Sequence, residues 1–221
     1  MLRTEIIYNA FASCGIDFYT GVPDSLLKDF CAWMTDQTGS HRHIVAANEG
    51  TAIGLAAGHY LATEHPALVY MQNSGLGNAV NPLLSLADKQ VYQIPMILLV
   101  GWRGQPDGKD EPQHEKQGRV TPDLLDAMQI PYVVLAPEES KAIAQIRKAV
   151  CDSGESHSPC AILVRKETFE PYPWRHRQPA PRFLTREQAL KTVLERLGDR
   201  DIIVSTTGKI SLELYEYRVA L

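Results

Sequence analysis

The feature that most constrains the fold is a regular alternation of short apolar runs with segments of helix length. The runs are apolar throughout, rather than at every second position. Strands with this pattern are buried on both faces, as in a parallel sheet with helices on its two sides. The predicted strands are residues 16–22, 43–47, 67–72, 95–102, 132–136 and 160–165. The sequence therefore predicts an α/β fold with an open parallel sheet covered on both faces.

Helical segments precede and separate these strands, and several begin with residues that commonly cap helices. Thr4 is a candidate N-cap of the first helix. Asp24 and Ser25 are candidate caps of the helix after the first strand. Thr121, followed by Pro122 at the first helical position, is the expected start of a later helix.

A proline-rich segment, residues 167–184, interrupts the alternation and predicts an extended, fairly stiff connector. After it, Thr185 and Gln188 form a capping-box pattern for a helix, residues 201–205 predict a strand, and a second helix follows Lys209. One strand between two helices is too little structure to form a hydrophobic core of its own. The prolines of the connector are Pro171, Pro173, Pro179 and Pro181.

These patterns predict three parts. Residues 1–166 form one complete domain, residues 167–184 form the linker, and residues 185–221 are the incomplete start of a second α/β domain. We therefore expect the sequence given to be a truncated chain.

The charge balance and the apolar runs exclude several classes of protein. The sequence has 22 Lys and Arg against 26 Asp and Glu, and it contains no basic stripe that would bind a phosphate backbone. The longest continuous apolar run, residues 94–100, is too short to span a bilayer, and the first residues lack the apolar core of a signal peptide. We expect a cytoplasmic protein with no nucleic-acid or membrane partner.

The cysteines and histidines form no metal-binding pattern. The sequence contains no C-x-x-C pair, and its seven histidines are scattered. We expect reduced structural thiols and no metal ligands in this chain. The cysteines are Cys14, Cys31, Cys151 and Cys160.

Polar residues follow the predicted strands, where ligands bind in open parallel sheets. Glu49 follows the second strand and precedes a helix rich in Gly and Ala, which a planar ligand or another backbone can approach closely. Its alternative role is electrostatic, because an acidic residue in the first turn interacts favourably with the helix dipole. Asp24 follows the first strand, and a helix cap is the alternative role there.

The segment NSGLGNAV after the third strand predicts a tight turn that positions polar groups at a crevice. Its G-x-G pattern suggests a dinucleotide site, but Val80 stands at the third glycine position and no acidic residue follows at the expected spacing. Ser74 is a poor candidate for a hydrolase nucleophile, because Gln72 replaces the first glycine of the G-x-S-x-G motif.

Residues 103–118, RGQPDGKDEPQHEKQG, form a polar segment that we expect to be a loop covering or lining a site. His114 lies in it, near Lys109, Lys116 and Arg119. This group could hold or protonate an anionic substrate, and a solvated surface loop is an equally good interpretation.

Several blocks resemble the N-terminal, pyrimidine-binding domain of the phosphonopyruvate decarboxylase family of thiamine diphosphate enzymes. They are GVPDSLL, AANEGTAIGLAAG, YMQNSGLGNAVNPLLSLAD, IPMILLVGWRG and KDEPQHEKQG. The related sulfopyruvate decarboxylases share the first four. The segments KDEPQH and IIVSTTGKISLELYEYR resemble the phosphonate enzymes, in which both halves belong to one polypeptide.

This resemblance implies conversion of 3-phosphonopyruvate to phosphonoacetaldehyde and CO2 in phosphonate biosynthesis, with thiamine diphosphate and Mg2+. Glu49, in NEG, matches the glutamate that hydrogen-bonds the aminopyrimidine ring. Asp24, in GVPDS, matches an acidic position that assists proton transfer. The other implied contacts are Asn73, Ser74 and Gly75 to the cofactor and, less strongly, His114 to the substrate.

The sequence also departs from the family pattern. The family holds the diphosphate and Mg2+ with a G-D-G motif in its C-terminal domain, and the sequence given contains no G-D-G. Leu212 stands where the resemblance leads us to expect arginine. In the family, the glutamate of one subunit meets the cofactor held by its partner. We therefore expect a homo-oligomer, a missing cofactor-anchoring domain and no activity from this chain alone.

Two alternatives stay open at this point. The first is a sulfopyruvate decarboxylase-like subunit, because phosphonate and sulfonate are both small tetrahedral anions. The second is a noncatalytic assembly module that keeps the same fold.

Overall fold

The structure is a computed structural model that describes residues 1–175, 183–206 and 208–220. The chain divides into two compact units, Met1–His176 and Arg177–Leu221. The predicted connector spans this division, and its Pro179 and Pro181 lie outside the described residues. The assignment of the three parts as pyrimidine-binding domain, linker and start of a diphosphate-binding domain stays a prediction.

The first unit contains a six-stranded sheet in the order β2-β1-β3-β4-β6-β5, and all of its neighbouring strands are parallel. The predicted α/β fold with an open parallel sheet is confirmed. The third predicted strand has the observed bounds, because its run of apolar residues is buried along almost its whole length. The strands are β1 Tyr19–Gly21, β2 His43–Val45, β3 Ala67–Gln72, β4 Met96–Gly101, β5 Tyr132–Val134 and β6 Cys160–Val164.

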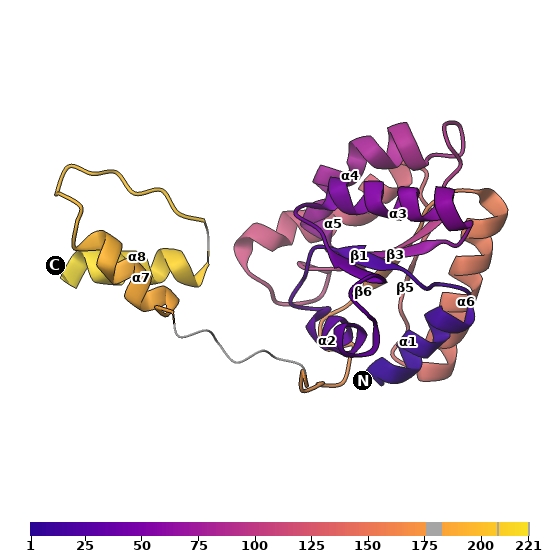
Figure 1. Ribbon diagram of the computed structural model, residues 1–221, viewed down its shortest axis with the longest axis horizontal. Helices are drawn as coiled ribbons and strands as arrows, with labels where there is room; N and C mark the ends of the chain where they lie inside the picture. The colour runs from indigo at the N-terminus through magenta and orange to yellow at the C-terminus, as the bar shows by residue number, and fades with distance from the viewer. Residues whose placement is uncertain (176–182, 207, 221) are drawn as a thin grey trace. The chain divides into compact units, whose positions relative to one another are not determined.

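Helices cover both faces of this sheet (Figure 1). Helices α3, α4 and α5 pack on one face, and α1, α2 and α6 pack on the other. Successive residues of β3 point to opposite faces of the sheet. Val69 lies in the core beneath α3, α4 and α5, and Tyr70 lies in the core beneath α1, α2 and α6. The helices are α1 Thr4–Ser13, α2 Lys28–Gln37, α3 Glu49–Thr63, α4 Leu76–Pro82, α5 Pro112–Ala127 and α6 Glu139–Ser156.

Helix α5 begins at Pro112, so the predicted start at Thr121 is wrong, and so is the expectation of a loop through residue 118. Pro122 lies inside the helix, where its missing N–H would leave the carbonyl oxygen of Gly118 unpaired. The indole Nε1 of Trp102 donates a hydrogen bond to that oxygen at 2.8 Å. A contact with the end of β4 therefore allows the helix to continue through proline.

The predicted caps of the first two helices are also wrong. Arg3 is the N-cap residue of α1 and Leu27 that of α2, and neither helix has a side-chain cap. An isolated bridge pairs Leu2 with Phe169, which keeps the chain extended up to the helix start, and Thr4 is then the first helical residue.

The second unit contains α7 Arg186–Leu194 and α8 Lys209–Ala220. The predicted capping box is confirmed, because Thr185 and Gln188 each accept a hydrogen bond from the other's backbone N–H. The predicted strand at residues 201–205 is wrong for the part of the chain that the structure describes. Its Ile202 and Val204 are 91% and 90% exposed, because no described strand pairs with this segment.

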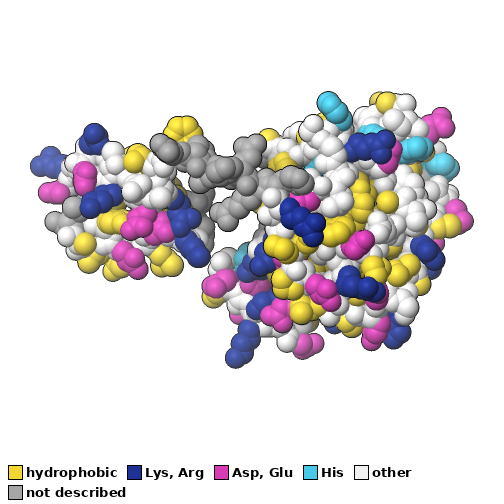
Figure 2. Space-filling view, turned by 60° about the horizontal axis from the view of Figure 1, so that its bottom comes forward, with side chains coloured by type: hydrophobic (Ala, Val, Ile, Leu, Met, Phe, Trp, Pro, Cys, Tyr) yellow, Lys and Arg dark blue, Asp and Glu magenta, His cyan; other side chains and the backbone are white. Residues whose placement is uncertain are grey.

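Charged side chains of both signs are interspersed on the face of the first unit that Figure 2 shows. Such a surface has no single-sign field of the kind that draws in a nucleic-acid backbone. Within the described ranges, no helix combines the length and apolar character needed to cross a membrane.

Candidate active site

The candidate site lies at the carboxyl edge of the sheet in the first unit. Side chains from the loops after β1, β2, β3 and β4 meet there. The loop after β1 contacts the end of β4, and the residue that begins α3, after β2, contacts the turn after β3. The sequence placed the candidates at this edge, and the structure shows which of them touch.

Glu49 is the first residue of α3, and Asn48 caps this helix by accepting a hydrogen bond from the backbone N–H of Thr51 at 2.9 Å. The half-buried Glu49 side chain accepts a hydrogen bond at Oε2 from Asn78 Nδ2, at 2.8 Å. It also covers Gly75 so closely that a Cβ on Gly75 would lie 2.6 Å from Glu49 Cδ. The structure thus brings together two candidates, Glu49 and Gly75.

Asn73 and Ser74 follow β3 in a single 3-10 turn but have different surroundings. Asn73 is fully buried, and its Nδ2 donates to the carbonyl oxygen of Arg103 and to Thr121 Oγ1, both at 2.9 Å. Its Oδ1 accepts from the backbone N–H of Arg103 at 3.2 Å. Ser74 is exposed, and its hydroxyl accepts from Gln72 Nε2 at 2.7 Å. The Asn73 amide therefore links the end of β3 to the backbone of Arg103 and to Thr121 on α5.

Asp24 is 6% exposed, and its carboxyl lies against Gly101 at the end of β4. Its Oδ2 accepts a hydrogen bond from the backbone N–H of Leu26 at 2.8 Å, whereas its buried Oδ1 has no partner among the described residues. Burial raises the pKa of the Asp24 carboxyl, although the Leu26 N–H and the charge of Arg103 act in the opposite direction. Asp24 therefore holds the turn before α2 and is a carboxyl that retains its proton more readily than an exposed one.

Two residues at this edge were not among the candidates from the sequence. Arg103, two residues beyond β4, donates from Nε and Nη2 to the Asp110 carboxylate at 2.8 and 2.5 Å, and from Nη1 to Ser25 Oγ at 3.0 Å. Arg103 lies in the block IPMILLVGWRG and Asp110 in KDEPQHEKQG, but the resemblance gave neither residue a role. The available signal was the position of Arg103 directly after a predicted strand, which it shares with Asp24 and Glu49.

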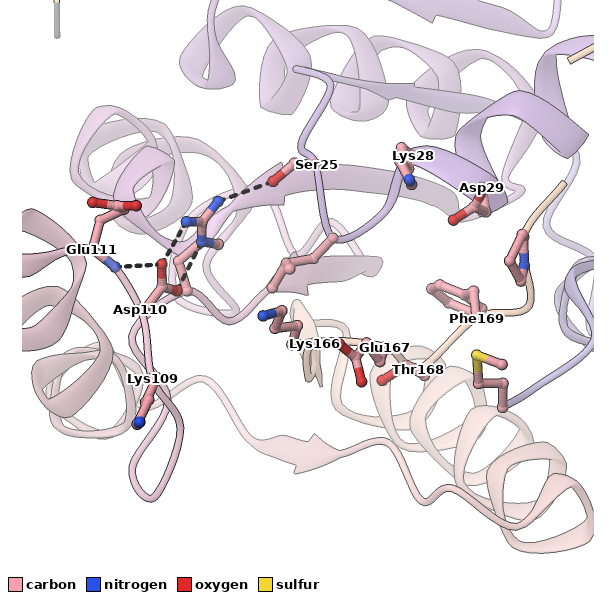
Figure 3. Close-up of a pocket in the computed structure, with 14 residues that line it drawn as sticks. Ser25, Lys28, Asp29, Lys109, Asp110, Glu111, Lys166, Glu167, Thr168 and Phe169 are labelled. Carbon is pink, nitrogen blue, oxygen red and sulfur yellow. Dashed lines mark hydrogen bonds and ion pairs between the residues drawn. The ribbon is translucent and has the colours of Figure 1, made fainter. Parts of the chain in front are cut away.

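A cavity of about 630 Å³ opens beside these residues. Figure 3 shows Lys28 and Asp29 on one side of it and Lys109, Asp110 and Glu111 on the opposite side. It is lined by segments that follow β1, β4 and β6. Acidic and basic side chains thus face the same hollow.

His114 does not line this cavity. It occupies the first turn of α5, is half-buried, and is not among the residues that line the 630 Å³ hollow. Its imidazole makes no hydrogen bond to another described residue. Its role as a substrate contact stays a prediction.

Comparison with known proteins identifies the class. The family described as "Thiamine pyrophosphate enzyme, N-terminal TPP binding domain" matches residues 1–130. This match covers more than half of the sequence. The chain belongs to the thiamine pyrophosphate (thiamine diphosphate) enzyme family.

Within this family, the chain is similar to decarboxylases of two kinds. It is 32% identical to the phosphonopyruvate decarboxylase of Streptomyces viridochromogenes, over 97% of this chain and 57% of that protein. It is 37% identical to the sulfopyruvate decarboxylase subunit alpha of Methanococcus maripaludis, over 74% of this chain and 95% of that subunit. The chain thus spans somewhat more than half the length of the phosphonopyruvate decarboxylase and nearly the whole length of the subunit.

Solved structures support the fold. The benzoylformate decarboxylase from Polynucleobacter necessarius superposes with a TM-score of 0.58 and 16% identity, covering 87% of this chain and 36% of that one. The 4-hydroxybenzoylformate decarboxylase from Rhodococcus jostii gives a TM-score of 0.57 with 18% identity, covering 87% of this chain and 37% of that one. At these identities the likeness establishes the fold alone.

The residues around Glu49 fit the pyrimidine half of thiamine diphosphate. A carboxyl group is a suitable hydrogen-bond partner for a ring nitrogen, and the absence of a Cβ on Gly75 makes room for the Glu49 side chain in this position. The described residues contain no group of three or more His, Cys, Asp or Glu that could hold a metal ion.

Proposed function

We propose that this chain is the pyrimidine-binding part of a thiamine diphosphate-dependent decarboxylase that converts 3-phosphonopyruvate to phosphonoacetaldehyde and CO2 in phosphonate biosynthesis. The observation that carries the proposal is the Glu49 carboxylate, fixed by Asn78 and set against Gly75 at the carboxyl edge of the sheet. Family membership and similarity to phosphonopyruvate decarboxylases support it.

Glu49 has one task in this proposal. Its carboxyl shares a proton with a nitrogen of the pyrimidine ring, and Asn78 and the start of α3 hold it in position for that bond. When bound, thiamine diphosphate supplies the electron sink that accepts the pair released as CO2 leaves. A small residue at Gly75 keeps the carboxyl close to the ring.

Asp24 moves a proton. Because burial raises its pKa, the carboxyl can carry a proton at a pH where an exposed aspartate would be ionised. In the proposed reaction the leaving carboxylate is replaced by a proton, which Asp24 helps to deliver. Asn73 supports this arrangement by holding the backbone of Arg103.

The remaining requirements lie outside these residues. The diphosphate and Mg2+ are held by another part of the enzyme or by another chain, so the chain alone shows no turnover. The active enzyme is then a cytoplasmic homo-oligomer that acts on a small anionic 2-keto acid, with no nucleic-acid or membrane partner.

A second candidate is the alpha subunit of a sulfopyruvate decarboxylase. The observation that favours it is the 95% coverage of such a subunit by this chain. In that case a separate subunit would supply the diphosphate site, and a sulfonate would replace the phosphonate.

The test is an activity assay of the chain with thiamine diphosphate and Mg2+, with and without a supplied C-terminal half of phosphonopyruvate decarboxylase. We expect CO2 release from phosphonopyruvate only in the complemented sample. Preference for sulfopyruvate would favour the second candidate, and no activity with either substrate would leave the assembly module as the better interpretation.

Glu49→Gln is the sharper variant in this assay. We expect it to lower kcat by about 100-fold or more, because the amide cannot share a proton with the ring nitrogen. Glu5→Gln, an exposed substitution in the first turn of α1, is the matched control and should retain full activity. If the Glu49 variant kept wild-type turnover, its role would be refuted.

A further inference from the structure

Arg103 joins three of the loops at the carboxyl edge of the sheet. Its backbone is bonded to Asn73 after β3, and its side chain is bonded to Ser25 after β1 and to Asp110 before α5. We propose that Arg103 is a positioning residue that holds the loop carrying Asp24 in place at the end of β4. This inference rests on the function proposed above for the role of Asp24.

The backbone of Arg103 is fixed first. The Asn73 amide bonds both its N–H and its carbonyl oxygen, much as a neighbouring strand would. Thr121 Oγ1, on α5, accepts the second hydrogen of the same amide and donates to the carbonyl oxygen of Gln117. Moving the Arg103 backbone would leave the fully buried Asn73 amide without its hydrogen-bond partners, which is costly, so the Arg103 backbone has a defined position.

The guanidinium is then oriented by Asp110. The two nitrogens that face Asp110 form a fork on its carboxylate, which also accepts hydrogen bonds from the backbone N–H groups of Gly104 and Glu111, both at 2.8 Å. The hydrogen bonds from Arg103 hold the pKa of Asp110 well below its ordinary range, although burial acts against them. Asp110 is therefore a fixed anion that sets the direction of the arginine.

The third side-chain nitrogen reaches the neighbour of Asp24. Nη1 donates to Ser25 Oγ at 3.0 Å, and Ser25 is exposed, so this hydroxyl has no packing of its own to fix it. The adjacent Asp24 carboxyl accepts a hydrogen bond from the N–H of Leu26. Arg103 thus holds Ser25, and Leu26 holds Asp24, in the same loop.

The Arg103–Asp110 pair differs from an ordinary surface ion pair of the same chain. Arg3 and Glu139 form the same two-bond fork, but their side chains are 59% and 31% exposed. The side chains of Arg103 and Asp110 are 20% and 15% exposed, so solvent screens their interaction less. The exposed pair therefore provides a matched control.

Several titratable or charged groups act on Asp24 or share its surroundings. Arg103 acts on it from the end of β4. The charge of Asp24 in turn helps to raise the pKa of the Cys31 thiol on α2, after the larger effect of burial. Lys28, His43 and Tyr70 line a 550 Å³ hollow together with Asp24. Arg103 is the cation whose charge lowers the pKa of Asp24, so its removal should move the titration of Asp24 to higher pH.

The test is a 13C NMR titration of the Asp24 carboxyl in the chain itself, with Asp24→Asn to assign the signal. We expect Arg103→Gln to move the titration midpoint to higher pH and to change the amide signals of residues 24–26. Arg103→Lys should retain the charge but still change those amide signals, because a lysine cannot form the fork. Arg3→Gln, the control, should alter neither.

Ser25→Ala removes only the direct link and keeps the fold, because the residue is exposed. We expect it to change the same amide signals and, in the complemented enzyme, to lower kcat at an almost unchanged KM. Arg103→Lys should lower kcat further, by about 10- to 100-fold through misplacement of the proton donor.

Unchanged Asp24 titration and loop signals in Arg103→Gln and Ser25→Ala would overturn the positioning role. The NMR readout needs no cofactor or turnover, so absence of activity in the complemented enzyme would contradict the proposed function and leave the positioning of Asp24 measurable.

Discussion

The two candidate carboxyl groups, Asp24 and Glu49, occupy equivalent places but are held differently. Each lies against a glycine from another strand end: Asp24 against Gly101 and Glu49 against Gly75. Asp24 is 6% exposed and bonded to backbone, whereas Glu49 is half-buried and bonded to the exposed side chain of Asn78.

This difference separates two kinds of task. A buried carboxyl on a short side chain has one position, and burial changes its affinity for a proton. A longer, half-exposed carboxyl can adjust to a ligand that arrives beside it. The difference agrees with the roles proposed above, proton transfer for Asp24 and cofactor contact for Glu49.

Gly101→Ala should have the largest effect on stability. A Cβ there would lie 3.0 Å from Asp24 Cγ, overlap its Oδ2, and lie 3.4 Å from Leu26 Cβ, so the buried loop would have to move. We expect the free energy of unfolding to fall by about 2–3 kcal/mol, as in other overpacked cores. Urea unfolding measures it.

Gly54→Ala is the control for this measurement, because nothing lies within 4 Å of the added Cβ. It should leave the free energy of unfolding unchanged or raise it by up to about 1 kcal/mol. Equal stabilities of Gly101→Ala and Gly54→Ala would show that the Asp24 loop can move aside without cost. Asp24 would then be no more rigidly held than Glu49.

Asp24→Asn should have an intermediate effect that depends on pH. Because the pKa of Asp24 is raised by folding, its protonated form contributes stability below the unfolded pKa, and this is lost as pH rises through the folded pKa. The asparagine variant cannot ionise. It should therefore be more stable than the wild type at pH 7, by about 1 kcal/mol.

Thermal unfolding across pH 3 to 8 measures this difference, which should shrink toward acid pH. Asp123→Asn, an exposed substitution on α5, is the control and should follow the wild type throughout. A variant less stable than the wild type at pH 7 would mean that the Asp24 charge stabilises the fold.

Gly75→Ala should have the smallest effect on stability and a clear effect on the cofactor. The added Cβ would displace the Glu49 side chain, which can swing toward solvent, so we expect a loss of less than about 1 kcal/mol. Affinity for thiamine diphosphate in the complemented enzyme should fall by about 10-fold, the equivalent of one lost charged hydrogen bond.

Isothermal titration calorimetry measures that affinity. Gly77→Ala, two residues further on with open space around its Cβ, is the matched control and should bind as the wild type does. Equal affinities in both variants would argue against Glu49 as the pyrimidine contact.

The order of elements in the first unit could be predicted because burial on both faces leaves a strong local signal. The run of residues 67–72 matches β3 for this reason. The start of α5 could not be predicted, because Pro122 is tolerated only through the hydrogen bond from Trp102 to Gly118. The strand expected at residues 201–205 failed for a related reason: a strand needs a partner, and no described strand pairs with this segment.

The candidate site was also predicted only in part from the sequence. Asp24, Glu49 and residues 73–75 could be placed at the carboxyl edge from the sequence, because each follows a predicted strand. Arg103 and Asp110 were not among the candidates. The contacts that these side chains make with one another could not be predicted from the sequence. Asn73 and Arg103 are 30 residues apart in sequence, and only the folded chain shows the hydrogen bonds between them. The role of Asn73 as a cofactor contact stays a prediction.

The sequence by itself determined the α/β class, the parallel sheet and the edge at which the candidate residues lie, since these follow from local apolar patterns and strand order. Only the tertiary structure decided that Asp24 is buried against Gly101, that Glu49 covers Gly75, and that Arg103 joins the loops around them. Such contacts depend on how strands far apart in sequence align side by side, and no local pattern records that alignment.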